Sequence, residues 1–187
     1  MERAKKGDIV LLFLDASHFV MGCDFLGSVY GRERRLVRTW SGRKRCNVLG
    51  AIDFLTKKVH TITNDRYITA TEVCEMLQKL RAVYTGKEVH LVLDNARYQK
   101  CRAVQELALC LDIHLDYIPP YSPNLNLIER LWKFVKGQLR SQYYDDFPLF
   151  CDIIISLIDS STTTNKALID QLIGDNVQLF DDLSSAA

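Results

Sequence analysis

Residues 88–118, EVHLVLDNARYQKCRAVQELALCLDIHLDYI, are the part of the sequence that most clearly indicates the fold class. They open with a short apolar run that ends in Asp94 and Asn95. A segment with helical spacing of apolar residues follows at about 100–111, and a second strand-like run follows at 113–118. A strand, a helix and a strand form the unit that joins parallel strands. The stretch therefore predicts an α/β fold.

The segments before this stretch extend the same pattern toward the amino terminus. Apolar residues recur at nearly every fourth position from about Thr69, which predicts a helix that stops at Gly86. DIVLLFLD at 8–15 is typical of a strand buried on both faces. β-rich runs at 19–31, CNVLGAIDF and KKVHTIT would supply three antiparallel strands. We therefore expect a mixed five-stranded sheet, with three antiparallel strands followed by parallel strands, flanked by helices.

The composition fits one soluble globular domain. The chain has 187 residues, of which 48% are hydrophobic, and this is ample for a single core. No apolar run approaches the roughly 18–20 residues of a membrane helix, and the amino terminus has no signal-peptide pattern. The six cysteines form no close pair, so neither a zinc ribbon nor a disulfide framework is expected. These features predict a cytoplasmic protein.

Charge is distributed unevenly along the chain. Residues 1–140 contain 23 bases and 15 acids, a net charge of +8, whereas the segment from Ser141 onward has one base and eight acids, a net charge of −7. The first part could therefore face a polyanion, and the acidic tail would pack elsewhere or bind a partner. We expect the main globular part of the domain at 1–150 and a helical acidic extension of the same domain at 151–187.

Three carboxylates are expected at one edge of the sheet. Asp15 and Asp94 each end a predicted strand, and the carboxyl ends of adjacent parallel strands share an edge. Glu129 lies in the first turn of a helix predicted at about 125–140, after the proline-rich segment PPYSPN. Oxygen-only ligands favour Mg²⁺ or Mn²⁺, and two such ions can activate phosphodiester cleavage. For either aspartate alone, a turn-forming role is the alternative.

The motifs FLDASHF, LVLDNARYQ and PPYSPNLNLIERLWKFVK resemble the catalytic domain of DDE transposases, in the bacterial insertion-sequence branch of the mariner-like superfamily. The resemblance covers about residues 8–150, and the 34 residues between Asp94 and Glu129 match the spacing of that branch. It implies a ribonuclease H-like fold and metal-dependent DNA strand cleavage and transfer at transposon ends. It also implies that Asp15, Asp94 and Glu129 are the catalytic residues and hold two Mg²⁺ or Mn²⁺ ions.

Two groups of basic residues are candidate DNA contacts. Lys133, Lys136 and Arg140 share the helix face of Glu129, and such a row of cations suits a phosphate backbone. A basic stretch at 32–45 is either a second DNA contact or a solvated face. Its candidate residues are Arg34, Arg35, Arg38, Arg43, Lys44 and Arg45.

Three polar residues are candidates for supporting the carboxylates. His18, Asn95 and Asn126 could orient water or DNA around them. The alternatives are a surface histidine for His18 and local caps for the asparagines. Trp132 is expected in the core, with stacking on a base as its alternative.

The expected partners are double-stranded DNA, as transposon ends and target, and a second copy of the chain. The resemblance implies both partners. We expect no membrane partner, and we expect the protein in the cytoplasm, associated with the nucleoid. Because the first predicted strand starts by residue 8, a helix-turn-helix recognition region would be encoded separately, or the chain would be a truncated copy or an excised part. Two alternatives remain: an inactive DNA-binding or assembly relic, and another ribonuclease H-like nuclease.

Overall fold

The structure is a computed structural model that describes the chain except for residues 1, 22–43, 120–124, 141, 143 and 164–187. The described part contains five helices and five strands. In chain order they are α1 (Glu2–Lys5), β1 (Val10–Val20), β2 (Arg45–Asp53), β3 (Val59–Asn64), α2 (Ala70–Val83), β4 (Val89–Leu93), α3 (Arg102–Cys110), β5 (Ile113–Tyr117), α4 (Ile128–Leu139) and α5 (Phe147–Thr163).

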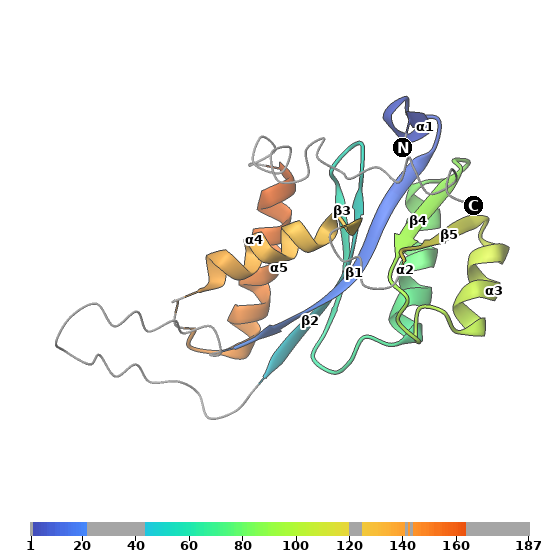
Figure 1. The fold of residues 1–187 in the computed structure, drawn as a ribbon. Helices are drawn as coiled ribbons and strands as arrows, with labels where there is room; N and C mark the ends of the chain where they lie inside the picture. The colour runs from blue at the N-terminus through green and yellow to red at the C-terminus, as the bar shows by residue number, and fades with distance from the viewer. Residues whose placement is uncertain (1, 22–43, 120–124, 141, 143, 164–187) are drawn as a thin grey trace.

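The strands form one mixed sheet in the order β3-β2-β1-β4-β5 (Figure 1). β1, β2 and β3 pair antiparallel, whereas β4 pairs parallel with β1 and β5 pairs parallel with β4. The predicted mixed five-stranded sheet is therefore confirmed. The crossover through α3 joins the two parallel strands of residues 88–118, as the sequence indicated.

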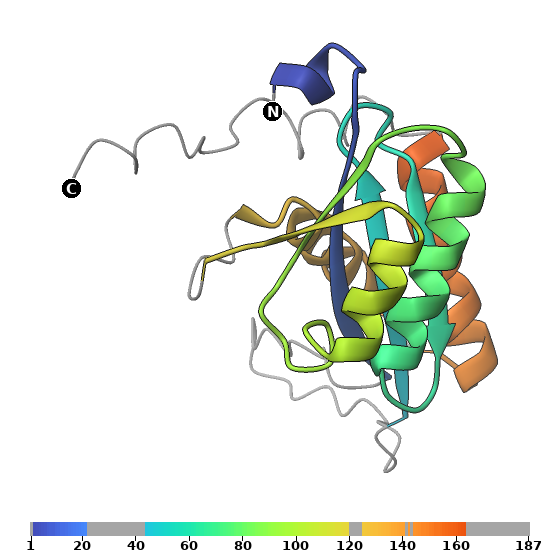
Figure 2. The ribbon, with the colours of Figure 1, turned by 90° about the vertical axis from the view of Figure 1, so that its right-hand side faces the viewer.

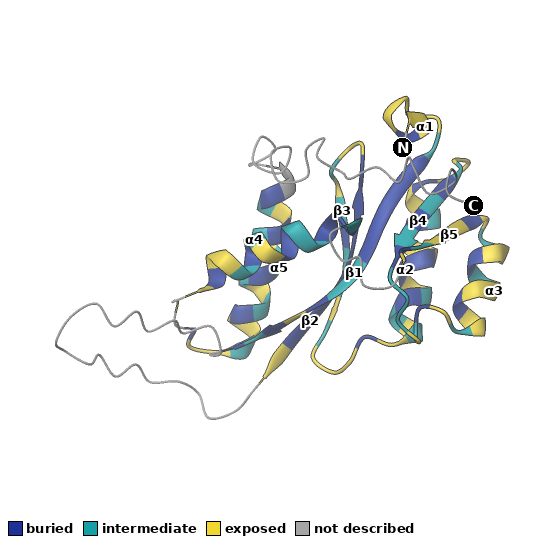
Figure 3. Cartoon of the chain, viewed as in Figure 1, coloured by how far each residue is buried: buried dark blue, intermediate teal, exposed yellow. Residues whose placement is uncertain are grey.

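Helices cover both faces of the sheet (Figures 1 and 2). Alternation along β1 sends Leu12 and Leu14 toward the core under α2 and α3, and Leu11 and Phe13 toward the core under α4 and α5. The first half of β1 is accordingly buried, whereas the helices carry both buried and exposed residues (Figure 3). Within the described part of the chain, no helix is long and apolar enough to span a membrane.

β1 is longer than the sequence indicated. The prediction that Asp15 ends the first strand was wrong, because residues 15–20 continue to pair with β2, from Asp15 opposite Gly50 to Val20 opposite Arg45. The start of the β-rich run predicted at 19–31 therefore belongs to β1, and its residues 22–31 lie outside the described residues. The parallel pairing of β1 with β4 stops at Phe13. Asp15 thus lies just beyond the end of its parallel neighbour.

The helices before and after the parallel strands begin where local side chains stabilise them. Thr69 caps α2 through a capping box with Glu72, and the chain after α2 turns through Gly86, whose φ is +72°. α4 begins at Ile128, three residues after the predicted start, and ends one residue before the predicted end. Glu129 lies in the first turn of α4, as predicted.

Candidate active site at the carboxyl end of β4

The pairing of β1 with β4 brings Asp15 and Asp94 to neighbouring positions. Phe13 lies opposite Val92, so two further steps along each strand direction reach Asp15 and Asp94. Strand alternation places both residues on the same face as Phe13 and Val92, which contact the core under α4. The register therefore accounts for two of the three predicted acids meeting on the α4 face.

Glu129 approaches the same point from α4. The apolar side of this helix packs on β1 and β2 through residues that include Ile128, Leu131 and Val135, and this leaves Glu129 half-buried at the site. Burial and the charge of Asp94 raise the pKa of Glu129, while Lys136 lowers it. The structure thus brings all three predicted carboxyl groups within electrostatic range of one another.

Asp15 is the most perturbed of the three acids. Burial, followed by the charge of Asp94, raises its pKa to about 7, and Glu129 contributes in the same direction. The backbone N–H of Ala16 and the indole of Trp132 oppose this shift. Three carboxylates that repel one another in a partly buried place are stabilised by a cation, because the cation favours their ionised forms.

Asn126, just before α4, makes hydrogen bonds to β1 and to Asp94. Its Nδ2 donates to the backbone carbonyl of Leu14 at 2.9 Å and to Oδ1 of Asp94 at 3.5 Å, and the residue is 1% exposed. The longer contact is weak. The predicted supporting position of Asn126 therefore agrees with its contact to one of the acids.

A cleft of about 380 Å³ opens over this place. Asp15 and Glu129 line it together with Lys133, Lys136 and Arg140, so the predicted row of cations borders the same space as the acids. Ala16, Ser17, His18 and Trp132 complete the lining. An anionic ligand lying in this cleft would meet cations along α4 and carboxylates at its inner end.

Four buried polar side-chain atoms of the described residues have no hydrogen bond, and two of them belong to residues that line the cleft, Ser17 and Trp132. Among the described residues these atoms are Ser17 Oγ, Gln99 Oε1, Asn126 Oδ1 and Trp132 Nε1. The indole N–H of Trp132 lies near enough to Asp15 to lower its pKa, but it falls short of hydrogen-bond geometry. Native proteins leave few such atoms unpaired, and functional sites are where the exceptions occur.

Two packing residues and one tyrosine were not identified from the sequence as parts of the site. Trp132 is 3% exposed, which agrees with its predicted core position, and its ring covers Gly50 so closely that a Cβ there would lie 2.6 Å from Cη2. An isolated glycine inside a predicted strand can signal such a close approach. The pKa of Tyr98 is raised by burial and by the charge of Asp15, so its hydroxyl lies near the acids.

The remaining candidates lie elsewhere or have other partners. His18 Nδ1 is 2.6 Å from Oδ1 of Asn47, and the Asn95 side chain donates to the carbonyl of Ile118. Lys44 and Arg45 line a separate groove that also contains Arg66, Tyr67 and Phe147. The candidates Arg34, Arg35, Arg38 and Arg43 lie outside the described residues.

Comparisons with known proteins agree with the fold. A family model described as DDE superfamily endonuclease matches residues 10–150. No curated protein matches the chain. Among solved structures, the chain is similar to the Mos1 strand transfer complex, with a TM-score of 0.64, 16% identity, and coverage of 92% of this chain and 52% of that one.

Two further Mos1 structures give the same result. The Mos1 mariner paired end complex with Mn has a TM-score of 0.62 and 16% identity, with 94% of this chain and 57% of that chain covered. The catalytic domain of Mos1 mariner transposase has a TM-score of 0.54 and 12% identity, with 87% and 82% covered. These likenesses and the strand order confirm the predicted ribonuclease H-like fold. The chain spans about half the length of the Mos1 chain in the strand transfer complex.

Proposed function

The chain belongs to the DDE superfamily endonucleases, and we propose that it is the catalytic domain of a transposase that cleaves and joins DNA strands at transposon ends. The observation that carries this proposal is the meeting of Asp15, Asp94 and Glu129 beside a cleft bordered by cations. We assign residues 1–150 to the catalytic domain and 151–187 to an acidic helical extension. α5 spans this boundary and packs in the core under α4, and residues 164–187 lie outside the described part.

The donor set of the three acids fits hard divalent cations. Carboxylate oxygens suit Mg²⁺ and Mn²⁺. Burial, followed by repulsion from Asp94, raises the pKa of Asp15, and bound positive charge would oppose both effects. Asp15, Asp94 and Glu129 would hold the ions. When bound, two such ions activate an attacking oxygen and stabilise a leaving oxygen at a phosphodiester. The carboxylate oxygens of the three acids do not all lie within 4.8 Å of one another, as they need not when the acids are shared between two ions.

The chain's own residues would bind and orient the DNA. Lys133, Lys136 and Arg140 would contact phosphates and set the strand along the cleft, because phosphate contacts fix register and orientation. Asn126 would hold the Asp94 carboxylate in place. Trp132 would exclude water beneath Asp15. A homodimer, a helix-turn-helix region that recognises the ends, and a location at the nucleoid complete the proposal.

Metal-dependent nicking of DNA tests this function. Purified chain, combined with its DNA-recognition region, should nick a supercoiled plasmid bearing transposon ends when Mg²⁺ or Mn²⁺ is present. Asp94→Asn should abolish nicking and leave the unfolding temperature nearly unchanged, because Asp94 is only partly buried. A matched control is Asp112→Asn, which changes an acid on the turn between α3 and β5.

The pattern of products distinguishes the proposal from its alternatives. Absence of nicking under every metal, with salt-sensitive DNA binding unchanged by Asp94→Asn, would indicate an inactive assembly module. Preferential cutting of RNA–DNA hybrids or junctions would indicate another nuclease. Joining of cut ends to a second DNA molecule would support strand transfer.

A further inference from the structure

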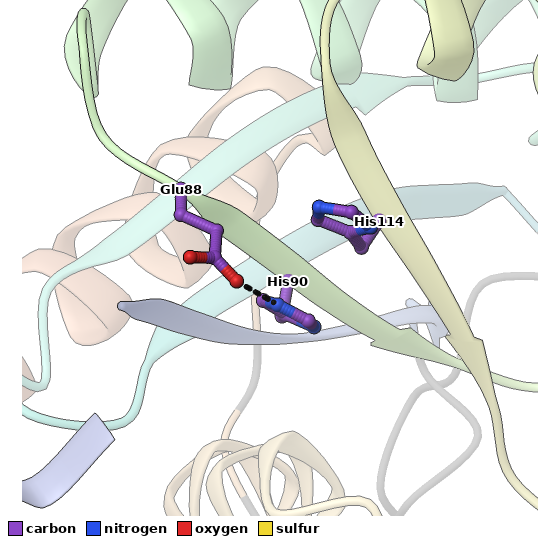
Figure 4. Close-up of side chains that lie close together, drawn as sticks. All are labelled: Glu88, His90 and His114. Carbon is purple, nitrogen blue, oxygen red and sulfur yellow. Dashed lines mark hydrogen bonds and ion pairs between the residues drawn. The ribbon is translucent and has the colours of Figure 1, made fainter. Parts of the chain in front are cut away.

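A second cluster of metal-binding side chains lies at the other end of β4. Glu88, His90 and His114 each offer one ligand atom, and these three atoms all lie within 4.8 Å of one another (Figure 4). Within the described part of the chain, no other group of three such residues meets this condition. Asp94 lies six residue steps after Glu88 along an extended strand, which corresponds to about 20 Å. The cluster is therefore separate from the carboxylates of the proposed active site.

Strand register produces this cluster. His90 in β4 lies directly opposite His114 in β5. Alternation puts Glu88 and His90 on one face of the sheet, because Val89 and Leu91 between and beside them point into the core under α2 and α3. α4 and α5 contact β1, β2 and β3, and within the described part of the chain Glu88 and His90 are partly exposed and His114 is exposed. The ligand atoms thus come from two adjacent strands and stay open to solvent.

The hydrogen bonds of His90 already have the arrangement of a supported ligand. Its Nδ1 is 2.9 Å from Oδ2 of Asp116, and its Nε2 is 3.0 Å from Oε1 of Glu88. A carboxylate that accepts from one imidazole nitrogen fixes the tautomer and turns the other nitrogen toward a metal. Arg3 donates to both oxygens of Glu88, from Nη2 to Oε2 at 2.7 Å and from Nη1 to Oε1 at 3.2 Å, and Oε1 also faces Nε2 of His90.

We propose that Glu88, His90 and His114 bind one zinc ion, through Oε1 of Glu88, Nε2 of His90 and one ring nitrogen of His114, with solvent in the fourth position. Two histidines and one glutamate are a recurrent zinc donor set, and imidazole nitrogens disfavour Mg²⁺. Ligand atoms in a tetrahedral zinc site are about 3.3 Å apart, close to the 3.0 Å between Glu88 and His90. The ion would cross-link the edge strand β5 to β4.

Binding requires one local movement. The rings of His90 and His114 are stacked, with centroids 4.6 Å apart and planes at 18°, whereas two imidazoles can reach one ion only when their planes converge on it. His114 is exposed and has no hydrogen bond or ion pair with a described residue, so its ring can turn without breaking a polar contact. Arg3 is also exposed and can keep its contact to Oε2.

A competing interpretation is a protonated His90 held between two carboxylates. Glu88 and Asp116 raise the pKa of His90 against the effect of burial, so a proton and a zinc ion would compete for Nε2. The competing interpretation gives His114 no role beyond ring contact. Substitution of His114 therefore separates the two.

Zinc titration of the chelator-treated full chain by calorimetry tests the proposal, in an Asp94→Asn background that weakens binding at the other acids. We expect one zinc per chain, and loss of this binding in His114→Ala. Asp116→Asn should weaken binding by about 10- to 100-fold, because it removes support for His90. Zinc at about 100 times Kd should raise the unfolding temperature by about 5–10 °C. Cys110→Ser, at an exposed thiol, should leave the titration unchanged.

The result that would overturn the proposal is zinc binding of equal affinity in His114→Ala, or no binding to the unmodified site. If His114→Ala fails to fold, zinc binding is tested instead from the ring signals of His90 and His114 in nuclear magnetic resonance spectra of the Asp94→Asn chain. Both sets should shift on addition of zinc and neither on addition of Mg²⁺. Unshifted signals contradict the site. None of these measurements uses nuclease activity, so their results test the zinc site independently of the proposed function.

Discussion

Replacement of Gly50 by alanine should disturb the active site through packing alone. Gly50 lies opposite Asp15 in the sheet and directly under the indole of Trp132. A Cβ at this position would lie 2.6 Å from Cη2 and 2.7 Å from Cζ2 of Trp132, and 2.9 Å from Cδ1 of Ile128. Carbon atoms in ordinary contact are about 3.5–4.0 Å apart. The added methyl group must therefore displace the side chains of Trp132 and Ile128, or the start of α4 that carries them, by roughly 1 Å.

Two opposing terms set the expected loss of stability. Overpacking a core typically costs about 1–3 kcal/mol, and alanine recovers about 0.5–1 kcal/mol of backbone entropy relative to glycine. The net loss should be about 1–2 kcal/mol, which lowers the unfolding temperature by about 2–8 °C for a chain of this size. Because Glu129 lies in the first turn of the same helix, its displacement should slow nicking by about 10- to 100-fold.

Thermal unfolding and plasmid nicking of Gly50→Ala should be measured beside Gly137→Ala. A Cβ at Gly137, on the exposed side of the same helix, meets no atom within 4 Å, so this control should gain about 1 kcal/mol and keep its activity. Gly50→Ala should destabilise a Trp132→Phe chain less than it destabilises the unmodified chain, since phenylalanine lacks the outer indole ring. Unchanged stability and nicking in Gly50→Ala would refute this packing.

Three further predictions concern the carboxylates, the cleft and the sheet. Asn126→Ala should reduce Mn²⁺ affinity and nicking by about 10-fold, because it removes the donor that contacts both Leu14 and Asp94, and an unchanged Mn²⁺ titration would count against that role. Log DNA affinity falls linearly with log salt concentration, and Lys136→Gln should make this dependence less steep by about one. Lys87→Gln, at an exposed position before β4, should leave the slope unchanged. Equal slopes in the two variants would exclude Lys136 from the DNA-binding surface. Burial, followed by nearby lysines, lowers the pKa of His60 to about 4, so the neutral ring stabilises the fold fully above pH 6.5 and this contribution falls as the pH drops from 6.5 to 4. The pKa shift corresponds to at most about 3 kcal/mol of unfolding free energy. Denaturant titrations at pH 7 and pH 4.5 should show that this free energy changes less with pH in His60→Gln than in the unmodified chain. An identical change in both would contradict the assignment.

The parts of the fold that follow from local pattern could be predicted from the sequence. Apolar runs marked β4 and β5, helical spacing marked α2 and α3, and the placement of Glu129 in the first turn of α4 followed from the change of pattern after the prolines. The full length of β1 did not follow. Asp15, Ser17 and His18 break the apolar run, and only pairing with β2 keeps these residues in the strand.

Features of the site that depend on register and packing were not predictable in the same way. Gly50 is one of nine glycines, and nothing in its neighbours along the chain indicates that Trp132 covers it. The pairing of His90 with His114 depends on the offset between two strands, which the sequence alone leaves undetermined. Convergence of Asp15 with Asp94 was expected for nearly the right reason: β4 ends beside Asp15, although β1 itself continues.

Anomalous diffraction from crystals grown with Mn²⁺ most directly tests whether the three acids form a metal site. The account predicts anomalous density between Asp15, Asp94 and Glu129 in the unmodified chain, and loss of that density in Asp94→Asn crystals prepared in the same way. Manganese bound elsewhere, with none at these carboxylates in the unmodified chain, would contradict it.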